Sequence, residues 1–309
     1  MNVAVIGYGG LGARRAAWLT QRGLHLAAVV DPDEAACERA RRQWPSALVT
    51  GSVEELGGAA AALDAVVVSG PHAAHVAASE WALAQHAAVL CEKPGGASFA
   101  ELQRLANSVL RTGTVLHVAA NHMHMPGVSA ALHALRDDIA AGAPLRRVAV
   151  HVGHNRRDQM LGWRLQRRGG GALRDNGWHA LALVHAALSA AGDSVERVEA
   201  VVTPHRGGHD VDEQTVVSML TVGGVVVDVV ATWDASDDYV FRARFDVGER
   251  SIVIRGPASA GWRLVSGGKS ELTELDLSAH DQGHSWLADL DAFLASVAAG
   301  HCDPLSPDQ

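Results

Sequence analysis

The chain has 309 residues, of which 48% are hydrophobic and 19% are charged, and its formal net charge is −8 at pH 7. This composition supplies enough apolar residues for a buried core, argues against a disordered chain, and at this length suits about two domains. Because no basic run is present to neutralise a phosphate backbone, the sequence argues against nucleic acid as a partner and favours a small-molecule substrate.

The cysteines and the apolar segments indicate in which cellular compartment the protein is expected. Cys37, Cys91 and Cys302 are odd in number and far apart, so they provide neither a disulfide framework nor a CxxC metal site, which fits a reducing cytosol. The segment Val3–Ile6 follows Met1 without the basic and long apolar regions of a signal peptide. No apolar run approaches the ~20 residues of a membrane span. We therefore expect a cytoplasmic protein with no membrane partner.

The first 119 residues alternate short β-rich runs with amphipathic, alanine-rich stretches. The expected strands are Asn2–Ile6, Leu26–Val30, Ala65–Ser69, Ala87–Cys91 and Val115–Ala119, and the expected helices lie near 11–22, 33–43, 72–85 and 98–111. This alternation is typical of a parallel, doubly wound sheet with right-handed crossovers. We expect residues 1–119 to form an α/β domain of the Rossmann type.

The pattern changes in the second half of the chain, where longer β runs are separated by turn signals. These runs are Val195–Thr203, Gln214–Thr221, Val225–Trp233, Val240–Val247 and Ser251–Arg255, with a hairpin turn at Gly223-Gly224. Helices are expected near 126–140 and 175–191, packed on one face of the sheet. We expect residues 120–309 to form an α+β domain with a largely antiparallel open sheet, whose other face pairs with a second subunit in a homodimer or homotetramer.

A glycine-rich turn lies between the first expected strand and the first expected helix, with the pattern GxGxxG from Gly7 to Gly12. Gly7 permits the tight turn, Gly9 lets the backbone approach a pyrophosphate, and Gly12 allows close helix–strand packing. The helix N-terminus adds unpaired N–H donors and positive potential. The pattern predicts a dinucleotide site formed by Gly7, Tyr8, Gly9, Gly10, Leu11 and Gly12. The alternative is a plain tight turn.

Asp31 decides between the two nicotinamide cofactors. It follows Gly12 at about the expected ~20 residues, at the end of the second strand, where a carboxylate binds the ribose hydroxyls. A carboxylate at that place repels a 2′-phosphate, and no adjacent Arg or Ser compensates. The sequence therefore favours NAD over NADP; the alternative is that Asp31 only caps the strand.

Two further polar segments follow expected strands, and open α/β sheets bind their ligands at the carboxyl ends of strands. Pro71, His72 and His75 follow one strand, and Glu92 and Lys93 precede Pro94 after another. These five residues are candidate cofactor contacts.

The combination of motifs resembles a known family. The glycine turn, Asp31-Pro32, Glu92-Lys93-Pro94, Asn121 and the segment 169–179, with the sequence GGGALRDNGWH, together resemble the Gfo/Idh/MocA family of glucose–fructose oxidoreductase and inositol dehydrogenase relatives. The resemblance extends through nearly the whole chain. It implies that Lys93, Asp175 and His179 meet at the nicotinamide.

The chemistry of these three side chains agrees with that assignment. Removal of a hydride from a carbinol carbon requires a base for the hydroxyl proton, and His179 has the side chain whose unperturbed pKa lies nearest neutrality. Asp175 precedes it by four residues, so on a helix both share one face. The Lys93 ammonium stabilises negative charge that develops on the oxygen. Whether Lys93 or His179 is the formal base stays open.

Candidate substrate contacts are Asn121, His122, Trp163, Arg164 and Trp178. Relatives often carry Asn-x-Arg where this chain has Asn121-His122-Met123, and an Asp where it has Leu183, so the substrate class is left open. Relatives also usually continue beyond Leu305 into a helix packed on the first domain, and we expect that helix to be missing or replaced.

No metal site is expected, although the chain has 17 histidines. The closely spaced His122, His124, His151 and His154 have no Cys or carboxylate that completes a recognisable ligand set.

The expected activity is reversible hydride transfer between NAD and a hydroxyl or keto group of a sugar, cyclitol or related small metabolite. Three alternatives stay open: a reductase of imines or conjugated double bonds, a redox-neutral lyase or hydrolase that retains its nicotinamide, and a non-catalytic dinucleotide-sensing regulator.

Overall fold

The computed structural model describes residues 1–155, 162–167, 169–257, 263–267, 273–276 and 282–300. The chain divides into two compact units, Met1–Ala119 together with the residues from Leu290 on, and Ala120–Asp289. The sequence analysis had assigned all of 120–309 to the second domain, so the structure differs from that division after Leu290.

The first unit is built on a six-stranded sheet with the order β3-β2-β1-β4-β5-β6, in which all neighbouring strands are parallel. The strands are β1 (Asn2–Ile6), β2 (His25–Val30), β3 (Leu48–Thr50), β4 (Ala65–Val68), β5 (Ala88–Cys91) and β6 (Leu116–Val118). The helices are α1 (Gly10–Gln21), α2 (Glu34–Gln43), the 3₁₀ segment η1 (Glu54–Ala62), α3 (His72–Ala84) and α4 (Phe99–Thr112). The predicted doubly wound α/β fold is confirmed; the sequence analysis missed only the short β3 among these strands.

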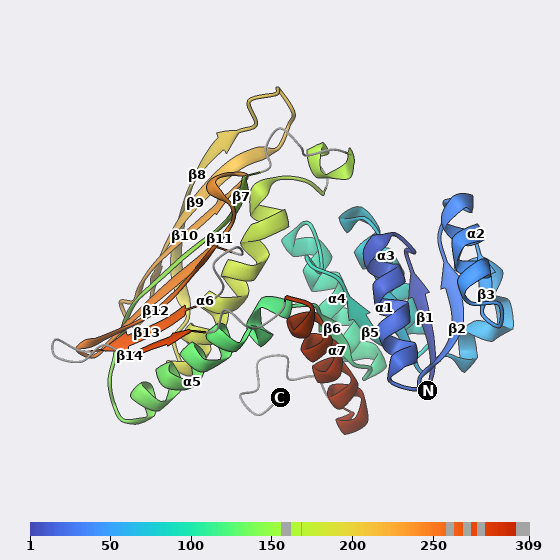
Figure 1. The fold of residues 1–309 in the computed structure, drawn as a ribbon, viewed down its shortest axis with the longest axis horizontal. Coiled ribbons are helices and arrows are strands. Elements are labelled where there is room, and N and C mark those ends of the chain that lie inside the picture. The colour runs from blue at the N-terminus through green and yellow to red at the C-terminus, as the bar shows by residue number, and fades with distance from the viewer. Residues whose placement is uncertain (156–161, 168, 258–262, 268–272, 277–281, 301–309) are drawn as a thin grey trace. The chain divides into compact units, whose positions relative to one another are not determined.

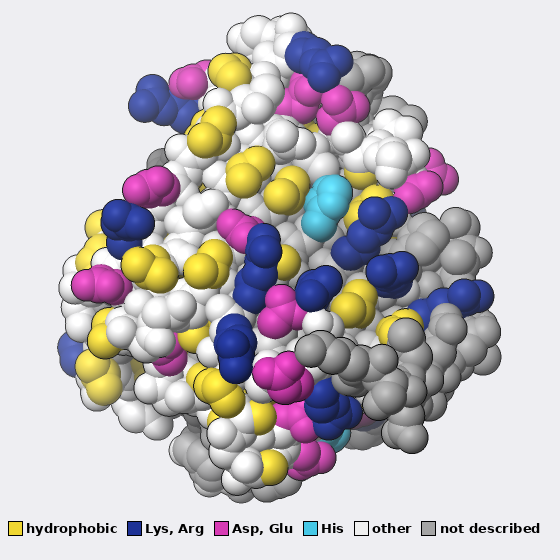
Figure 2. All heavy atoms as spheres, turned by 90° about the vertical axis from the view of Figure 1, so that its left-hand side faces the viewer, with side chains coloured by type: hydrophobic (Ala, Val, Ile, Leu, Met, Phe, Trp, Pro, Cys, Tyr) yellow, Lys and Arg dark blue, Asp and Glu magenta, His cyan; other side chains and the backbone are white. Residues whose placement is uncertain are grey.

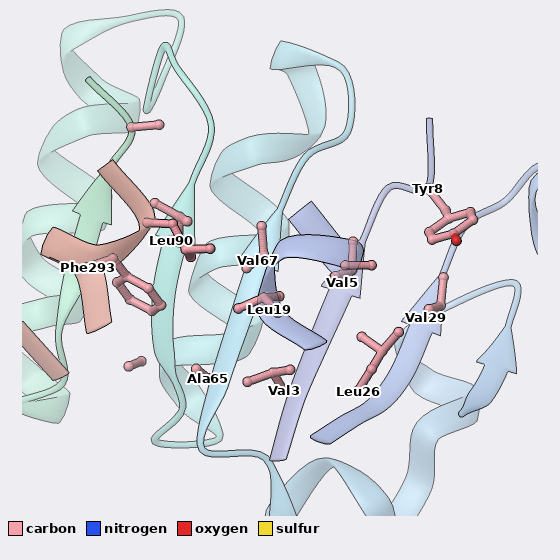
Figure 3. Packing of buried hydrophobic residues seen from close by; sticks show 14 of the residues in the cluster. Val3, Val5, Tyr8, Leu19, Leu26, Val29, Ala65, Val67, Leu90 and Phe293 are labelled. Carbon is pink, nitrogen blue, oxygen red and sulfur yellow. The ribbon is translucent and has the colours of Figure 1, made fainter. Parts of the chain in front are cut away.

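The core of this unit is completed by a helix from the far end of the chain. Leu290 and Phe293 of α7 (Gln282–Ala299) are fully buried and pack in one cluster with Val3, Val67 and Leu90. Figure 3 shows Phe293 and Leu90 in this layer of apolar side chains. α7 therefore packs on the first unit, whereas the expectation concerned a helix beyond Leu305, either missing or replaced, and α7 ends at Ala299.

The second unit contains an eight-stranded sheet with the order β14-β13-β12-β11-β7-β10-β9-β8. Its strands are β7 (Leu145–Asn155), β8 (Val195–Pro204), β9 (Asp212–Thr221), β10 (Val226–Thr232), β11 (Asp234–Val247), β12 (Arg250–Pro257), β13 (Arg263–Gly267) and β14 (Thr273–Asp276). Only the β7–β10 pair is parallel among these described strands, so the predicted, largely antiparallel sheet is confirmed.

Helices cover one face of this sheet, as Figure 1 shows for α5 (Pro126–Ala140) and α6 (Trp178–Ala190). The described residues of this unit also form three shorter segments: η2 (Asn121–His124), η4 (Gly162–Leu165) and the π-helix η5 (Leu173–Gly177). The expected helix over 175–191 is therefore two elements, because the π-helix runs directly into α6. The hairpin predicted at Gly223-Gly224 is confirmed: it joins the antiparallel strands β9 and β10, and Gly224 has a φ of 85°.

Among the described residues, no helix combines the length and the apolar character that crossing a bilayer requires.

Candidate functional site

The glycine turn after β1 is shaped by close backbone contacts on one side and open space on the other. Gly7 has a φ of 89°, and a Cβ at this residue would lie 2.5 Å from the Gly70 nitrogen. A Cβ at Gly12 would lie 1.9 Å from the Gly7 oxygen. At Gly9 and Gly10, by contrast, an added Cβ would meet nothing within 4 Å. The open side lies at the N-terminus of the twelve-residue helix α1, where a pyrophosphate fits.

Asp31 is held at the end of β2 by two backbone donors. The Tyr8 N–H donates to Oδ2 at 2.5 Å, and the Asp33 N–H donates to Oδ1 at 2.8 Å. Each carboxylate oxygen has a second lone pair, so Asp31 can still accept hydrogen bonds from ribose hydroxyls. The turn and Asp31 together fit a nicotinamide dinucleotide.

Tyr8, a candidate cofactor contact, has its side chain in the core rather than in the turn's open side. The residue is 1% exposed, and its hydroxyl is bonded to Gln43 and Trp44. Only the backbone of Tyr8 contributes to the site, through its bond to Asp31.

Glu92 is paired with an arginine that the sequence analysis missed. The Arg15 guanidinium donates to one Glu92 oxygen through Nη2 at 2.7 Å and through Nε at 3.0 Å. Arg15 is fully buried and also lies over the Trp18 ring at 5.8 Å. The signal was available, because Arg15 occupies the helical spacing of the buried residues Gly12, Ala16 and Leu19. The pair anchors the turn that carries Lys93, which is itself partly exposed.

His75 connects the same turn to the end of β4. Its Nδ1 lies 2.8 Å from the Pro94 oxygen and its Nε2 lies 2.9 Å from the Gly70 oxygen. The ring is buried and lies 5.5 Å from the ring of His72. Both ring nitrogens thus face backbone carbonyls, so His75 supports the Lys93 turn, while Pro71 is exposed at the start of α3.

In the second unit, the glycine run before η5 allows close backbone approach. A Cβ at Gly170 would lie 1.8 Å from the Arg164 oxygen, and one at Gly171 would lie 1.9 Å from Asp212 Oδ1. The other Asp212 oxygen accepts the Leu173 N–H at 2.8 Å. These contacts fix the beginning of the π-helix that carries Asp175.

Asp175 is buried, and its Oδ2 has partners from two other segments. The Trp233 indole N–H donates to it at 3.3 Å, and Arg164 Nε lies 3.6 Å away in an ion pair. Arg164, a candidate substrate contact, is thus placed beside a candidate catalytic carboxylate. The side chain of Trp163 lies outside the described residues, and Trp178 is partly exposed at the start of α6.

His179 lies in a cluster of rings on the same unit. Its ring centroid is 3.6 Å from that of His122, whose Nε2 is hydrogen-bonded to the Tyr239 hydroxyl. Burial raises the pKa of Tyr239. The sequence analysis did not select Tyr239, which comes from β11 and has no local motif around it.

The turn that carries Asn121 and His122 is anchored by α7. The buried Asp289 accepts the Ala120 N–H at 3.0 Å, and the Asn121 amide donates to Ser285 at 3.4 Å. The Asn121 side chain therefore contacts both Ser285 of α7 and the His122 ring.

Lys93 belongs to the first unit, and Asp175 and His179 belong to the second. Their meeting at the nicotinamide stays a prediction. Within the described residues, no group of three or more His, Cys, Asp or Glu side chains is arranged to hold a metal ion.

Comparison with protein families matches both parts of the chain. Residues 1–120 match an oxidoreductase family with an NAD-binding Rossmann fold, GFO_IDH_MocA, and residues 129–256 match the GFO/IDH/MocA C-terminal domain. A curated relative, the myo-inositol dehydrogenase Hyg17 of Streptomyces leeuwenhoekii, is 33% identical over 127 residues, which are 41% of this chain and 38% of that protein. The chain thus aligns with well under two thirds of that relative.

Solved structures share the fold over almost the whole length. GenD2 from gentamicin A biosynthesis, in complex with NAD, has a TM-score of 0.81 at 23% identity, covering 100% of this chain and 89% of that one. Levoglucosan dehydrogenase with NADH and levoglucosan has a TM-score of 0.83 at 19% identity, covering 100% and 92%. UDP-N-acetylglucosamine 3-dehydrogenase GnnA from Acidithiobacillus ferrooxidans has a TM-score of 0.77 at 22% identity, covering 99% and 93%.

Proposed function

Because the chain belongs to the Gfo/Idh/MocA family of NAD-binding oxidoreductases, we propose that it transfers a hydride between NAD and a hydroxyl or keto group of a sugar, cyclitol or related small metabolite. The observation that carries the proposal is the buried pair of motif residues, Asp175 and His179, in a chain whose first unit has the open glycine turn and Asp31. The similar proteins named above include dehydrogenases of inositol, levoglucosan and a nucleotide sugar, which supports a hydroxylated substrate.

Each side chain has one task in this mechanism. When bound by the glycine turn and Asp31, NAD would supply the hydride acceptor for the carbinol carbon. His179 takes the hydroxyl proton, and Asp175 orients the site from the adjacent helical turn. Lys93 donates a hydrogen bond to the reacting oxygen and stabilises the charge that develops there. Asp31 binds the ribose hydroxyls and makes NAD the preferred cofactor over NADP.

The assignment of Lys93 is tested with Lys93→Met, which keeps a long side chain but removes the ammonium. We expect turnover to be abolished and NADH binding to stay nearly unchanged, because the cofactor is held mainly by the glycine turn and Asp31. NADH absorbance on panels of sugars, cyclitols, ketones and imines measures turnover, and fluorescence titration measures NADH binding. Retained turnover would contradict the role of Lys93.

The same panels identify the reaction class. Reduction of NAD by a sugar or cyclitol supports the proposal, and NADH oxidation by imines alone points to an imine reductase. Product formation with no net change in NADH absorbance points to redox-neutral chemistry, and NADH binding without turnover on any panel points to a regulator.

The oligomeric state and the compartment belong to the same proposal. The outer face of the second sheet, away from α5 and α6, pairs with a second copy to form a homodimer or homotetramer. We place the protein in the cytoplasm, which agrees with the reduced state of the two described cysteines, Cys37 and Cys91, both buried thiols.

A further inference from the structure

Three buried side chains from three different elements meet in the second unit. His122 comes from η2, His179 from α6 and Tyr239 from β11, and none of them is more than 9% exposed. The His122 and His179 ring centroids are 3.6 Å apart, and the planes are inclined by 40°. Phe241, also from β11, covers the His122 ring at 5.3 Å. The cluster is therefore a fixed arrangement of rings around His122.

The two nitrogens of His122 face groups of different kinds. Nδ1 lies 3.3 Å from Asn121 Oδ1, and the Asn121 amide nitrogen is directed to Ser285 Oγ at 3.4 Å. A carbonyl oxygen only accepts hydrogen bonds, so this orientation of the Asn121 amide assigns the proton to His122 Nδ1. Nε2 is then the acceptor, and the Tyr239 hydroxyl donates to it.

We propose that Asn121 and Tyr239 hold His122 as the neutral Nδ1–H tautomer, and that His122 acts as a positioning residue for His179. This inference rests on the proposed function, in which His179 accepts the hydroxyl proton. The His122 ring restricts the orientation of the His179 ring by direct packing. Because it is neutral, it also does not repel the positive charge that His179 acquires when it takes the proton.

The rings and polar groups around His122 come from α6, β11, β7 and the turn of His122 itself. His179 lies on the α6 side, Tyr239 and Phe241 lie on the β11 side, and Asn121 belongs to the same turn as His122. His154 from β7 packs on Tyr239, with the ring centroids 4.8 Å apart. The hydroxyl of Tyr239 is thus the donor that occupies the His122 nitrogen which would otherwise take up a proton.

The first experiment reads the tautomer directly and needs no turnover. Full-length protein with ¹⁵N-labelled histidine is studied by long-range ¹H–¹⁵N NMR at neutral pH, with and without NADH, and the His122 signals are identified with His122→Gln. We expect the Nδ1–H tautomer, which is the less common form of free histidine. An Nε2–H tautomer or a doubly protonated ring would overturn the inference.

The second experiment removes the donor with Tyr239→Phe, which keeps the ring. We expect kcat/KM to fall about 10-fold, as a loss of precise orientation predicts. We also expect the acid limb of the kcat/KM profile to move to higher pH. Once His122 carries a proton, its positive charge opposes transfer of the hydroxyl proton to His179, so this form of the variant is inactive. NADH affinity should not change. A folded variant whose acid limb is unchanged would contradict the proposal.

Thr221→Val is a matched control in the same unit. It also removes a buried hydroxyl, one that is bonded to Asp193, so it should lower stability without moving the acid limb or the His122 tautomer. The failure of the proposed function is recognised separately, because the unsubstituted protein would then not reduce NAD with any sugar or cyclitol, and retained turnover in His179→Asn would contradict the role of His179. Loss of turnover in His179→Asn together with an Nε2–H tautomer of His122 would refute only the further inference.

Discussion

At the scale of single residues, the buried charge pair Arg15–Glu92 connects α1 to the turn that carries Lys93. Arg15 is completely buried and Glu92 is 7% exposed, so neither charge is well hydrated. The guanidinium also donates twice to the same carboxylate oxygen. Such a pair is weak evidence for net stabilisation, but the removal of one partner takes an opposite charge away from the other, buried group.

Glu92→Gln should therefore destabilise the protein strongly. The cost of breaking a buried pair is about 3–5 kcal/mol, and the turn that carries Lys93 should lose its anchor. Thermal unfolding measures the first effect, and kcat measures the second. The double variant Arg15→Met with Glu92→Met should recover much of the stability, because no isolated charge then remains. Equal unfolding temperatures for Glu92→Gln and the wild-type protein would refute the structural role of the pair.

At the scale of elements, the part of α7 from Leu290 on belongs to the first unit although it is far away in sequence from Met1–Ala119. Phe293 is fully buried, and its ring makes an edge contact with His117 at 6.1 Å. A helix at the end of the chain thus completes the core formed by β1, β4 and β5 (Figure 3).

Phe293→Ala should cost about 3–5 kcal/mol, the usual range for a buried phenylalanine. Phe99→Ala is the matched control, because Phe99 is also on a helix of the first unit but is 78% exposed, and its loss should stay within about 0.5 kcal/mol. Denaturant unfolding of both variants measures the difference. Similar losses for the two would show that α7 does not support this core.

The elements of the fold could be predicted from sequence where the local pattern agreed with the final structure. The βα alternation of the first unit and the glycine turn were of this kind. The central strand β7 was missed, although Val148, Val150 and Val152 alternate as in a half-buried strand, because Arg146 and Arg147 at its beginning and the histidines within it obscure the pattern. α7 was missed because its burial depends on a core built from the other end of the chain.

In the candidate site, too, residues with a local sequence motif were predicted, and residues that depend on tertiary contacts were not. The spacing of Asp175 and His179 was available from sequence, and the structure places both on adjoining helical segments. Trp233, which bonds to Asp175, and Tyr239, which bonds to the neighbouring His122, were not predicted. Trp233 lies between β10 and β11, and Tyr239 lies on β11, so both are far away in sequence from the groups they contact. Local patterns thus identified the motif residues, and tertiary pairing supplied the groups around them.

At the scale of the whole molecule, the outer face of the second sheet presents an apolar row among charges. The pairing register places Val201, Val216 and Val230 side by side on β8, β9 and β10. The next rows hold paired charges, such as Arg147 with Asp228 and Arg244 with Asp246. Figure 2 shows hydrophobic side chains interspersed with charged ones over this face. A surface with a central apolar row and charged borders suits a symmetric contact with a second copy.

Val216→Asp should therefore shift the protein toward the monomer. Across a two-fold axis the substitution places an acidic side chain from each copy in the apolar centre of the contact, where both lose hydration and repel each other. Sedimentation velocity over a range of concentrations measures the assembly. Leu110→Asp is the matched control, because Leu110 lies on α4 of the first unit and is 82% exposed, and it should leave the assembly unchanged. The prediction would be contradicted if the wild-type protein sedimented as a monomer at all concentrations, or if the Val216→Asp variant remained fully associated.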